Sequence, residues 1–463
     1  MAASSTSGIL SALSSSGLGI GQGIDVASTV AQLIAGLRGP EQVWQTQQQV
    51  LQNQSAALTN LNSEVTALAN AVNDLSDVSG AINARAVTSS DPGLVTASAS
   101  TTTPTGSHTV VVNSLATTGS YYSDAVASSS TALATGTFTI QVGNGTASTF
   151  TIDNTNNTMD GLAAAINNLN IGVTASVVDD ANGARLTIVS NASGASNDLT
   201  VTNESGGLTF TKGSKGTNAS LTVDGVPISS ASNLVTGVVP GLTLNLVGAD
   251  QNTQVQIGVT PDASTIEQAV TNFVSAYNTV IQDLNSQSTY NTATKSAGPL
   301  ASDSAASIVQ SELLAAMTFS NSSSGSVNTL ASLGITMNDD GTLSVDNATL
   351  SNAVATDYTD VQSFFHNSAG TGFADTLQNQ LNGLTDPTQG AFYVDIQGIN
   401  NEVQGFQDQI NNFEVYIANE QTMLTQQYTQ VDLALQQLPL LQQEINSELS
   451  GVFSNGNSSS SSK

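Results

Sequence analysis

The chain has 463 residues, which at ~100–200 residues per domain corresponds to roughly three to four domains. Only 7 residues are Lys or Arg against 35 Asp or Glu, giving a formal net charge of −28. Because phosphate backbones and anionic bilayers are bound by clustered Lys and Arg, this composition argues against nucleic-acid and membrane partners. The absence of Cys excludes disulfides, thiolate metal sites and a Cys nucleophile.

Residues 1–25 are rich in Gly and Ser. Such a segment buries little apolar surface, so we expect it to be disordered on its own and interpret it as an export segment. It has neither the basic part nor the long apolar part of a cleaved secretory signal, and no run in the chain approaches the ~20 apolar residues of a membrane span. Export would therefore need a route that leaves the N-terminus uncleaved.

The first predicted structural element is a helical coiled-coil leg over residues 26–80. Asp25 is a suitable N-cap for a short amphipathic helix, which should end near Gly39-Pro40 because the residue before a proline is disfavoured in helical backbone. The helix that follows carries a heptad repeat typical of coiled coils. The polar d positions Gln47 and Gln54 should weaken its seam locally. Its apolar a and d positions are Trp44, Leu51, Leu58, Leu61, Val65, Leu68, Val72 and Leu75.

After residue 80 the hydrophobic period changes to two, which predicts strands rich in Thr and Val. Residues 81–135 and 206–262 are expected to form the two parts of a β-rich head domain. Residues 136–205 should form an outer head domain with the order β-β-α-β-β, whose helix runs from about Met159 to Leu169. Turns are predicted at Asp180 to Gly183 and at Asp224-Gly225, where Asn, Asp and Gly tolerate turn backbone.

Helical spacing returns in residues 263–385, a mostly helical domain with a hairpin near 335–345. The C-terminal part, 386–450, has a second long heptad repeat and is predicted to pair with residues 40–80. Pro439 should kink or end this helix near Leu435, and residues 451–463 should form a disordered tail. The packing positions predicted in this leg are Val403, Phe406, Ile410, Phe413, Ile417, Leu424 and Val431.

These patterns together predict an α+β multidomain fold, in which paired terminal helices form a coiled-coil stalk that carries inserted β-rich head domains.

The sequence offers few candidate catalytic residues. His108 and His366 are on unrelated segments, and both are interpreted as structural. The run 338–341, Asn-Asp-Asp-Gly, imitates a calcium loop, but Thr336 and Asn347 occupy the positions of its anchoring carboxylates, so a hairpin turn is the better interpretation. The sequence thus indicates a non-enzymatic protein without a cofactor or metal.

Several linked motifs resemble the flagellar filament cap protein family, also called hook-associated protein 2. Gly23-Ile24-Asp25-Val26 resembles the family's N-terminal Gly-Leu-Asp-Ile signature, and residues 136–202 resemble a module of flagellins and hook-associated proteins. A departure occurs at Leu37-Arg38-Gly39-Pro40, where the family often has an acidic residue before the proline. Further segments that resemble the family, in the same order, are 221–229, 233–235, 239–244, 273–278, 298–304 and 333–336.

The resemblance implies a homo-oligomeric cap at the filament tip, pentameric in well-known relatives, with a range of about four to six subunits. Its implied partners are flagellin, a hook-associated junction protein and a flagellar export chaperone. The implied location is the extracellular flagellum tip, reached through the flagellar type III pathway. The cap would retain exported flagellin and promote its folding and polymerisation without covalent chemistry.

Two alternatives remain open from the residues. The polar head could bind glycans, which would make the chain an adhesin at the flagellar tip. The chain could also be another axial component, such as a hook-filament junction protein or a fibre-like protein, since paired terminal helices suit these proteins as well.

Overall fold

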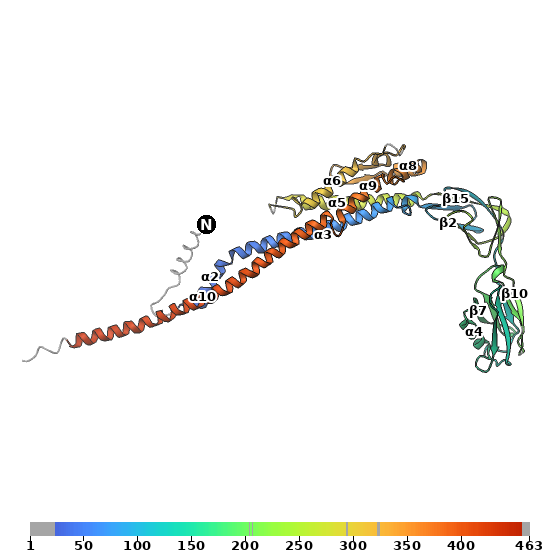
Figure 1. Cartoon of the computed structure of the whole chain (residues 1–463), viewed down its shortest axis with the longest axis horizontal. Helices are drawn as coiled ribbons and strands as arrows, with labels where there is room; N and C mark the ends of the chain where they lie inside the picture. The colour runs from blue at the N-terminus through green and yellow to red at the C-terminus, as the bar shows by residue number, and fades with distance from the viewer. Residues whose placement is uncertain (1–23, 203, 206, 293–294, 322–324, 456–463) are drawn as a thin grey trace, which may run out of the picture. The chain divides into compact units, whose positions relative to one another are not determined.

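A computed structural model describes residues 24–202, 204–205, 207–292, 295–321 and 325–455 (Figure 1). It confirms the α+β multidomain fold class, with long helices and antiparallel sheets. The chain divides into two compact units. The first comprises residues 1–64, 282–311 and 383–463, and the second comprises residues 65–281 and 312–382. None of the helices in the described part of the chain has the length and apolar character needed to cross a membrane.

The first unit is built mainly from the terminal helices. Asp25 caps the first of them by accepting a hydrogen bond from the Ser28 N–H at 3.1 Å. The helix ends at Leu37, and a new helix begins at Gly39 with Pro40 in its first turn, where proline is tolerated. The elements that contribute to this unit are α2 (Val26–Leu37), α3 (Gly39–Ser76), α5 (Ala263–Ser288), β16 (Tyr290–Asn291), β17 (Ser296–Ala297), α6 (Ser304–Met317), α9 (Phe373–Thr385) and α10 (Ala391–Asn455). α3, α5, α6 and α9 also contribute residues to the second unit.

The predicted end of the last helix near Leu435 is wrong. α10 runs through Pro439 to Asn455, which also extends it into the predicted disordered tail. A proline removes one N–H from the helix ladder and leaves a carbonyl one turn earlier without its donor. That carbonyl belongs to Leu435, whose neighbours 433–434 and 436–438 are exposed, so water can satisfy it at modest cost. Residues 456–463 of the predicted tail, and residues 1–23 of the predicted export segment, lie outside the described residues.

The second unit contains a β domain made from two parts of the chain. β3 pairs with β11 and β2 pairs with β14, so strands before and after the outer domain share sheets. Asp224 and Gly225 turn between β11 and β12 with φ of 51° and 80°, the left-handed backbone that such a hairpin turn requires. One sheet has the order β1 (Arg85–Ser89), β15 (Asp250–Pro261), β3 (Gly106–Ser114), β11 (Ala219–Val223) and β12 (Val226–Ser230). The other has β13 (Leu234–Thr236), β14 (Leu242–Leu246) and β2 (Val95–Ala99).

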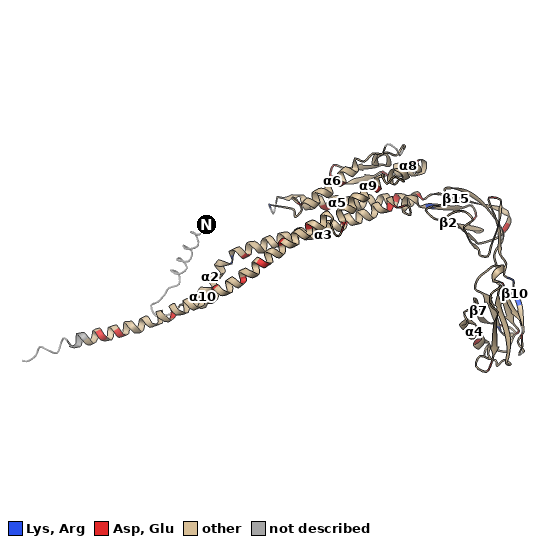
Figure 2. Cartoon of the chain, viewed as in Figure 1, with Lys and Arg blue, Asp and Glu red and all other residues tan. Residues whose placement is uncertain are grey.

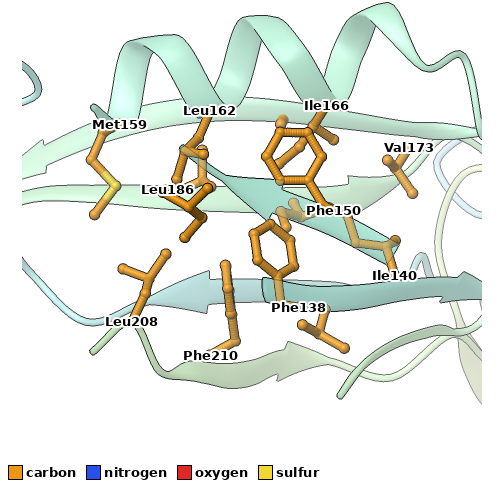
Figure 3. Close-up of a cluster of buried hydrophobic side chains, with 14 of the residues drawn as sticks. Phe138, Ile140, Phe150, Met159, Leu162, Ile166, Val173, Leu186, Leu208 and Phe210 are labelled. Carbon is orange, nitrogen blue, oxygen red and sulfur yellow. The ribbon is translucent and has the colours of Figure 1, made fainter. Parts of the chain in front are cut away.

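The outer β domain packs α4 (Met159–Asn168) against its strands, around Phe138, Phe150 and Phe210 (Figure 3). The helix was predicted within one residue, but the domain has more strands than the predicted β-β-α-β-β order. β4 (Ser120–Ser123) and β10 (Phe210–Ser214), which flank the predicted segment, complete a sheet with β8 (Gly183–Ser190) and β7 (Val173–Asp180). The second sheet consists of β6 (Ser148–Ile152), β5 (Gly136–Val142) and β9 (Leu199–Thr202).

The remaining part of the second unit includes the hairpin predicted near 335–345. Residues 338–342 form its turn, as expected. Asp346 then caps α7, a helix that the sequence pattern did not predict because its apolar positions are few. The elements are η1 (Ala81–Asn83), η3 (Leu330–Leu333), β18 (Ile335–Met337), β19 (Leu343–Val345), α7 (Asn347–Thr356) and α8 (Tyr358–Phe365). The other short helix, η2 (Ala195–Asn197), lies between β8 and β9 of the outer β domain.

Candidate functional site

The most informative site in the first unit is a charged clamp between the two ends of the chain. Arg38 lies at the break between α2 and α3, and its guanidinium binds Glu414 of α10 through two nitrogens, at 2.6 and 2.9 Å. It also binds Glu41 at 2.6 Å, and Gln45 donates to the other Glu41 oxygen at 2.9 Å. The hydrogen bonds from Arg38 hold the pKa of Glu414 below its usual range. In a chain with so few cations (Figure 2), this arginine holds the turn between α2 and α3 against α10.

α3 and α10 run antiparallel in the first unit. Trp44 meets Phe413 edge to face, with ring centroids 5.4 Å apart. Further along α3, Gln48 donates to the Gln407 side chain at 3.0 Å, and Ser55 lies 3.4 Å from the Asn400 side chain. The partners on α10 thus move toward lower numbers as α3 advances (Figure 1).

α2 covers the next part of α10, which was not foreseen from the heptads. Val30 and Ile34 of α2 bury Ile417 to 1% exposure. At the start of the described chain, the Ile24 N–H donates to the Asp432 carboxylate at 2.8 Å. The α2 contacts therefore continue along α10 beyond the point where α3 begins. Val26, Phe413, Leu424 and Tyr428 pack around this cluster.

The structure places the predicted packing residues in three classes of exposure. In α10, Ile410 and Ile417 are buried, whereas Val431 is 46% exposed in the single chain. Fully buried positions of α3 are Leu58 and Leu61 in the first unit and Val65, Leu68, Val72 and Leu75 in the second. Half-buried positions are Leu51, Val403, Phe406, Phe413 and Leu424. A role of these residues in oligomer packing stays a prediction.

Two carboxylates that the sequence analysis did not single out organise the start of α6. Asp303 is 4% exposed, caps α6 through the Ala306 N–H at 3.0 Å, and accepts a hydrogen bond from Gln54 of α3 at 3.0 Å. Asp395 of α10 accepts from Ser304 Oγ and from the Ala305 N–H, at 2.8 and 3.0 Å. The polar d position Gln54, expected to weaken the seam, therefore has a specific partner. The N-cap signal Asp303-Ser304 before a helical run could have identified the site.

Two asparagines in the family-like motifs hold backbone groups in the second unit, one at the start of strand β19 and one in a loop. Asn278 of α5 donates to the Leu343 carbonyl at 2.8 Å and accepts from the Leu343 N–H at 2.6 Å. Asn233 binds Ala116 in the same way: it donates to the Ala116 carbonyl at 3.0 Å and accepts from the Ala116 N–H at 2.7 Å. A primary amide that bonds both groups of one residue acts like a strand edge, and it holds that residue in one register.

Each histidine is paired with one carboxylate. His108 Nδ1 lies 2.8 Å from Asp224, which also accepts the Thr109 N–H, and the hydrogen bond from His108 lowers the pKa of Asp224. His366 Nδ1 lies 2.7 Å from Asp375. Within the described ranges, no three His, Asp or Glu side chains are grouped closely enough to hold a metal ion. The geometry of both histidines is that of side chains that fix a strand and a helix end.

Comparisons with known proteins agree on one family. The model described as "Flagellar hook-associated protein 2 N-terminus" matches residues 22–119, and the one described as "Flagellar hook-associated protein 2 C-terminus" matches residues 216–439. The chain is 30% identical over 277 residues to the B-type flagellar hook-associated protein 2 of Pseudomonas aeruginosa. This match covers 53% of this chain and 58% of that protein. It is 28% identical over 274 residues to the Escherichia coli flagellar hook-associated protein 2, and this match covers 54% of this chain and 58% of that protein.

The chain thus spans little more than half the length of these curated relatives. Among solved structures, it is similar to the D1-D2-D3 domains of the flagellar cap protein FliD from Escherichia coli. The TM-score is 0.61 at 28% identity, and the match covers 74% of this chain and 99% of that chain.

Proposed function

Since the chain belongs to the flagellar hook-associated protein 2 family, we propose that it caps the flagellar filament as a homo-oligomer of about four to six subunits, most simply a pentamer. The cap sits outside the cell at the filament tip, retains exported flagellin and promotes its folding and polymerisation. The observation that carries this proposal is the match of both family models, together with the likeness to a solved cap protein.

In the proposed function, the paired terminal helices act as legs and the β domains form the plate above the exit channel. The antiparallel pairing of α3 with α10 supports the leg assignment, because it gives each subunit a stiff element that presents apolar and polar side chains in a regular repeat. The clamp of Arg38 on Glu414 supports it further, since it holds the two chain ends as one element. The chain works by steric retention and non-covalent contacts, so it is not an enzyme.

The proposed function gives the protein two further partners, one for its export and one for its placement on the growing flagellum. A flagellar export chaperone hands the chain to the flagellar type III pathway, which leaves the N-terminus uncleaved. A hook-associated junction protein seats the cap before the first flagellin arrives.

The test is genetic and compares three strains of the source bacterium: wild type, a deletion of this gene, and the deletion complemented with the full chain. The proposal predicts that the deletion strain secretes unpolymerised flagellin into the medium and has short or missing filaments, and that the complemented strain recovers both. Full-length filaments in the deletion strain, without excess flagellin in the medium, would contradict the proposal.

A further inference from the structure

The outer β domain is joined to the rest of the second unit by two segments of chain. Residues 115–119 lead from β3 into β4, and residues 215–218 lead from β10 into β11, so the domain that holds β3 and β11 is called the inner β domain. The two segments bridge each other at Thr117 and Thr217, whose N–H groups donate to each other's carbonyls at 2.9 and 3.3 Å. Because a pair of strands alone is only marginally stable in water, this short bridge does not by itself hold the outer domain in one orientation.

A loop of the outer domain packs across both segments. This junction loop, residues 193–198, contains η2 and precedes β9. It donates three hydrogen bonds to the inner domain and to the two segments: Ser193 Oγ to the Ala231 carbonyl at 2.7 Å, the Gly194 N–H to the Thr117 carbonyl at 3.1 Å, and the Ala195 N–H to the Asn218 side chain at 2.8 Å. The loop thus gives the short bridge a third support.

Asp198, the last residue of the junction loop, adds charged contacts. Its Oδ1 accepts from the Gly216 N–H at 2.7 Å, and its Oδ2 accepts from Lys212 Nζ at 2.7 Å. Hydrogen bonds with an ionised partner are roughly twice as strong as neutral ones. The Asp198 side chain is 20% exposed, so water and salt screen these bonds only partly. The carboxylate therefore joins the loop firmly to the second segment and to β10.

Two glycines leave the room that this packing needs. A Cβ at Gly119, in the first segment, would lie 2.5 Å from the Leu199 nitrogen and 2.7 Å from Asp198 Oδ1. A Cβ at Gly216, in the second segment, would lie 2.8 Å from both Asp198 Cα and the Gly194 carbonyl oxygen. Neither glycine has a positive φ, so the close approach of the loop, rather than the backbone conformation, requires them. Both segments are thus adapted to contact with the same loop.

We propose that the junction loop is a lock that holds the outer β domain in one orientation on the inner β domain, and that the lock depends on Asp198. While the lock is closed, the two domains move as one body, so a partner bound to the outer domain is held in a fixed direction relative to the inner one. When the Asp198 bonds are lost, the two segments act as a hinge. The apolar core of the outer domain includes no residue of 193–198, all of which the structure describes, so the lock can open while that core stays folded.

Distances between two spin labels test the lock in the full-length chain, whose lack of Cys allows labelled positions to be introduced singly. One label is attached through Thr151→Cys, at an exposed position of β6, and the other through Gln254→Cys, at an exposed position of β15. The intact junction should give a single narrow distance distribution. Asp198→Ala, which removes the carboxylate, and Gly216→Ala, which sets a methyl group against the loop, should each broaden this distribution.

Hydrogen exchange provides a second measurement on the unlabelled proteins. Peptides covering 191–198 should exchange roughly tenfold faster or more in Asp198→Ala, since the loss of a hydrogen bond to a charged group changes an opening equilibrium by about this factor. Peptides covering 138–152, in the core of the outer domain, should exchange at the wild-type rate. This combination separates opening of the lock from unfolding of the domain.

Two matched variants control for charge and for added bulk. Asp179→Asn removes an equal charge from an exposed position of the outer domain, and Gly106→Ala adds a methyl group to the inner domain where no atom lies within 4 Å. Both should keep the narrow distribution. Asp198→Asn keeps an acceptor for the Gly216 N–H without the charge, so it should give an intermediate width, and it serves as the test if Asp198→Ala does not fold. A distribution as narrow as that of the wild type in the three junction variants, or equal broadening in Asp179→Asn, would overturn the lock.

Discussion

Arg38 and Glu414 lie 376 positions apart in the chain, yet their side chains form a two-pronged ion pair with bonds of 2.6 and 2.9 Å. A guanidinium and a carboxylate in this geometry fix each other in direction as well as distance. The pair therefore sets which part of α10 lies beside the break between α2 and α3. Sequence reasoning singled out the same position only as a departure from the family pattern.

The first prediction concerns this clamp. Arg38→Gln should speed hydrogen exchange across α2, residues 26–37, because the break between the helices loses its fixed point on α10. Arg38→Lys should give an intermediate effect, since an ammonium cannot reproduce the paired bonds. High salt should speed exchange of α2 in the wild type more than in Arg38→Gln, because the pair is partly exposed and is screened. Lys215→Gln, an equal loss of charge in the second unit, is the control. Unchanged protection of α2 in Arg38→Gln would contradict the clamp.

The second prediction concerns the apolar contacts of the terminal helices. Leu61 and Ile417 are 0% and 1% exposed, so Leu61→Ala and Ile417→Ala should each cost about 2–5 kcal/mol in the free energy of unfolding. Leu440 is 66% exposed, and Leu440→Ala should change the stability by less than about 0.5 kcal/mol. Denaturant unfolding followed by circular dichroism measures all three. Equal effects at the buried and exposed positions would mean that the helices do not pack as described.

The third prediction concerns the two-point bond between Asn278 and Leu343. Asn278→Ala leaves the N–H and the carbonyl of Leu343 without the amide that brackets them, which should cost about 1–3 kcal/mol. Asn278→Asp keeps the acceptor for the Leu343 N–H but sets a carboxylate oxygen against the Leu343 carbonyl in place of the amide donor, so at pH 7 it should be destabilised at least as much as the alanine variant. Thermal unfolding gives the order of the three proteins. Wild-type stability in either variant would show that Asn278 does not hold Leu343 through these two bonds.

The fourth prediction concerns pH and the start of α5. Asp262 caps this helix, and the hydrogen bonds from Ser264 and Thr265 hold its pKa below the ordinary range. A depressed pKa contributes stability that is present above about 3.9, the unfolded value, and is lost as the pH falls through the folded value. Asp262→Asn keeps a capping oxygen without the charge, so its deficit in melting temperature should shrink between pH 6 and pH 3. Asp262→Ala loses the cap and should remain less stable at both pH values, by about 1 kcal/mol. A deficit of Asp262→Asn that does not change with pH would contradict the charge effect.

The long helices were predictable because their signals are local and repeated. The heptads of α3 and α10, the N-cap Asp25 and the proline after Gly39 are each readable within one or two turns of helix. The turn residues Asp224 and Gly225 located a hairpin for the same reason, since their backbone conformation depends on the residue itself.

The contacts between distant segments were not predictable in this way. A heptad shows that a face is apolar but does not say which helix covers it, so the role of α2 against Ile417 was missed. The partnership of Gln54 with Asp303 requires the fold to bring positions 249 residues apart together. Pro439 was assigned its usual effect within a buried helix, whereas the exposed end of α10 tolerates it.

The location of the protein on the flagellum tests the central claim most directly. Antibodies against the outer domain, residues 136–202, can be imaged with gold labels on intact flagella, with the deletion strain as the control for specificity. The proposed cap function predicts a single label at the distal tip of each filament and none in the deletion strain. Label at the hook–filament junction or along the filament shaft would contradict it.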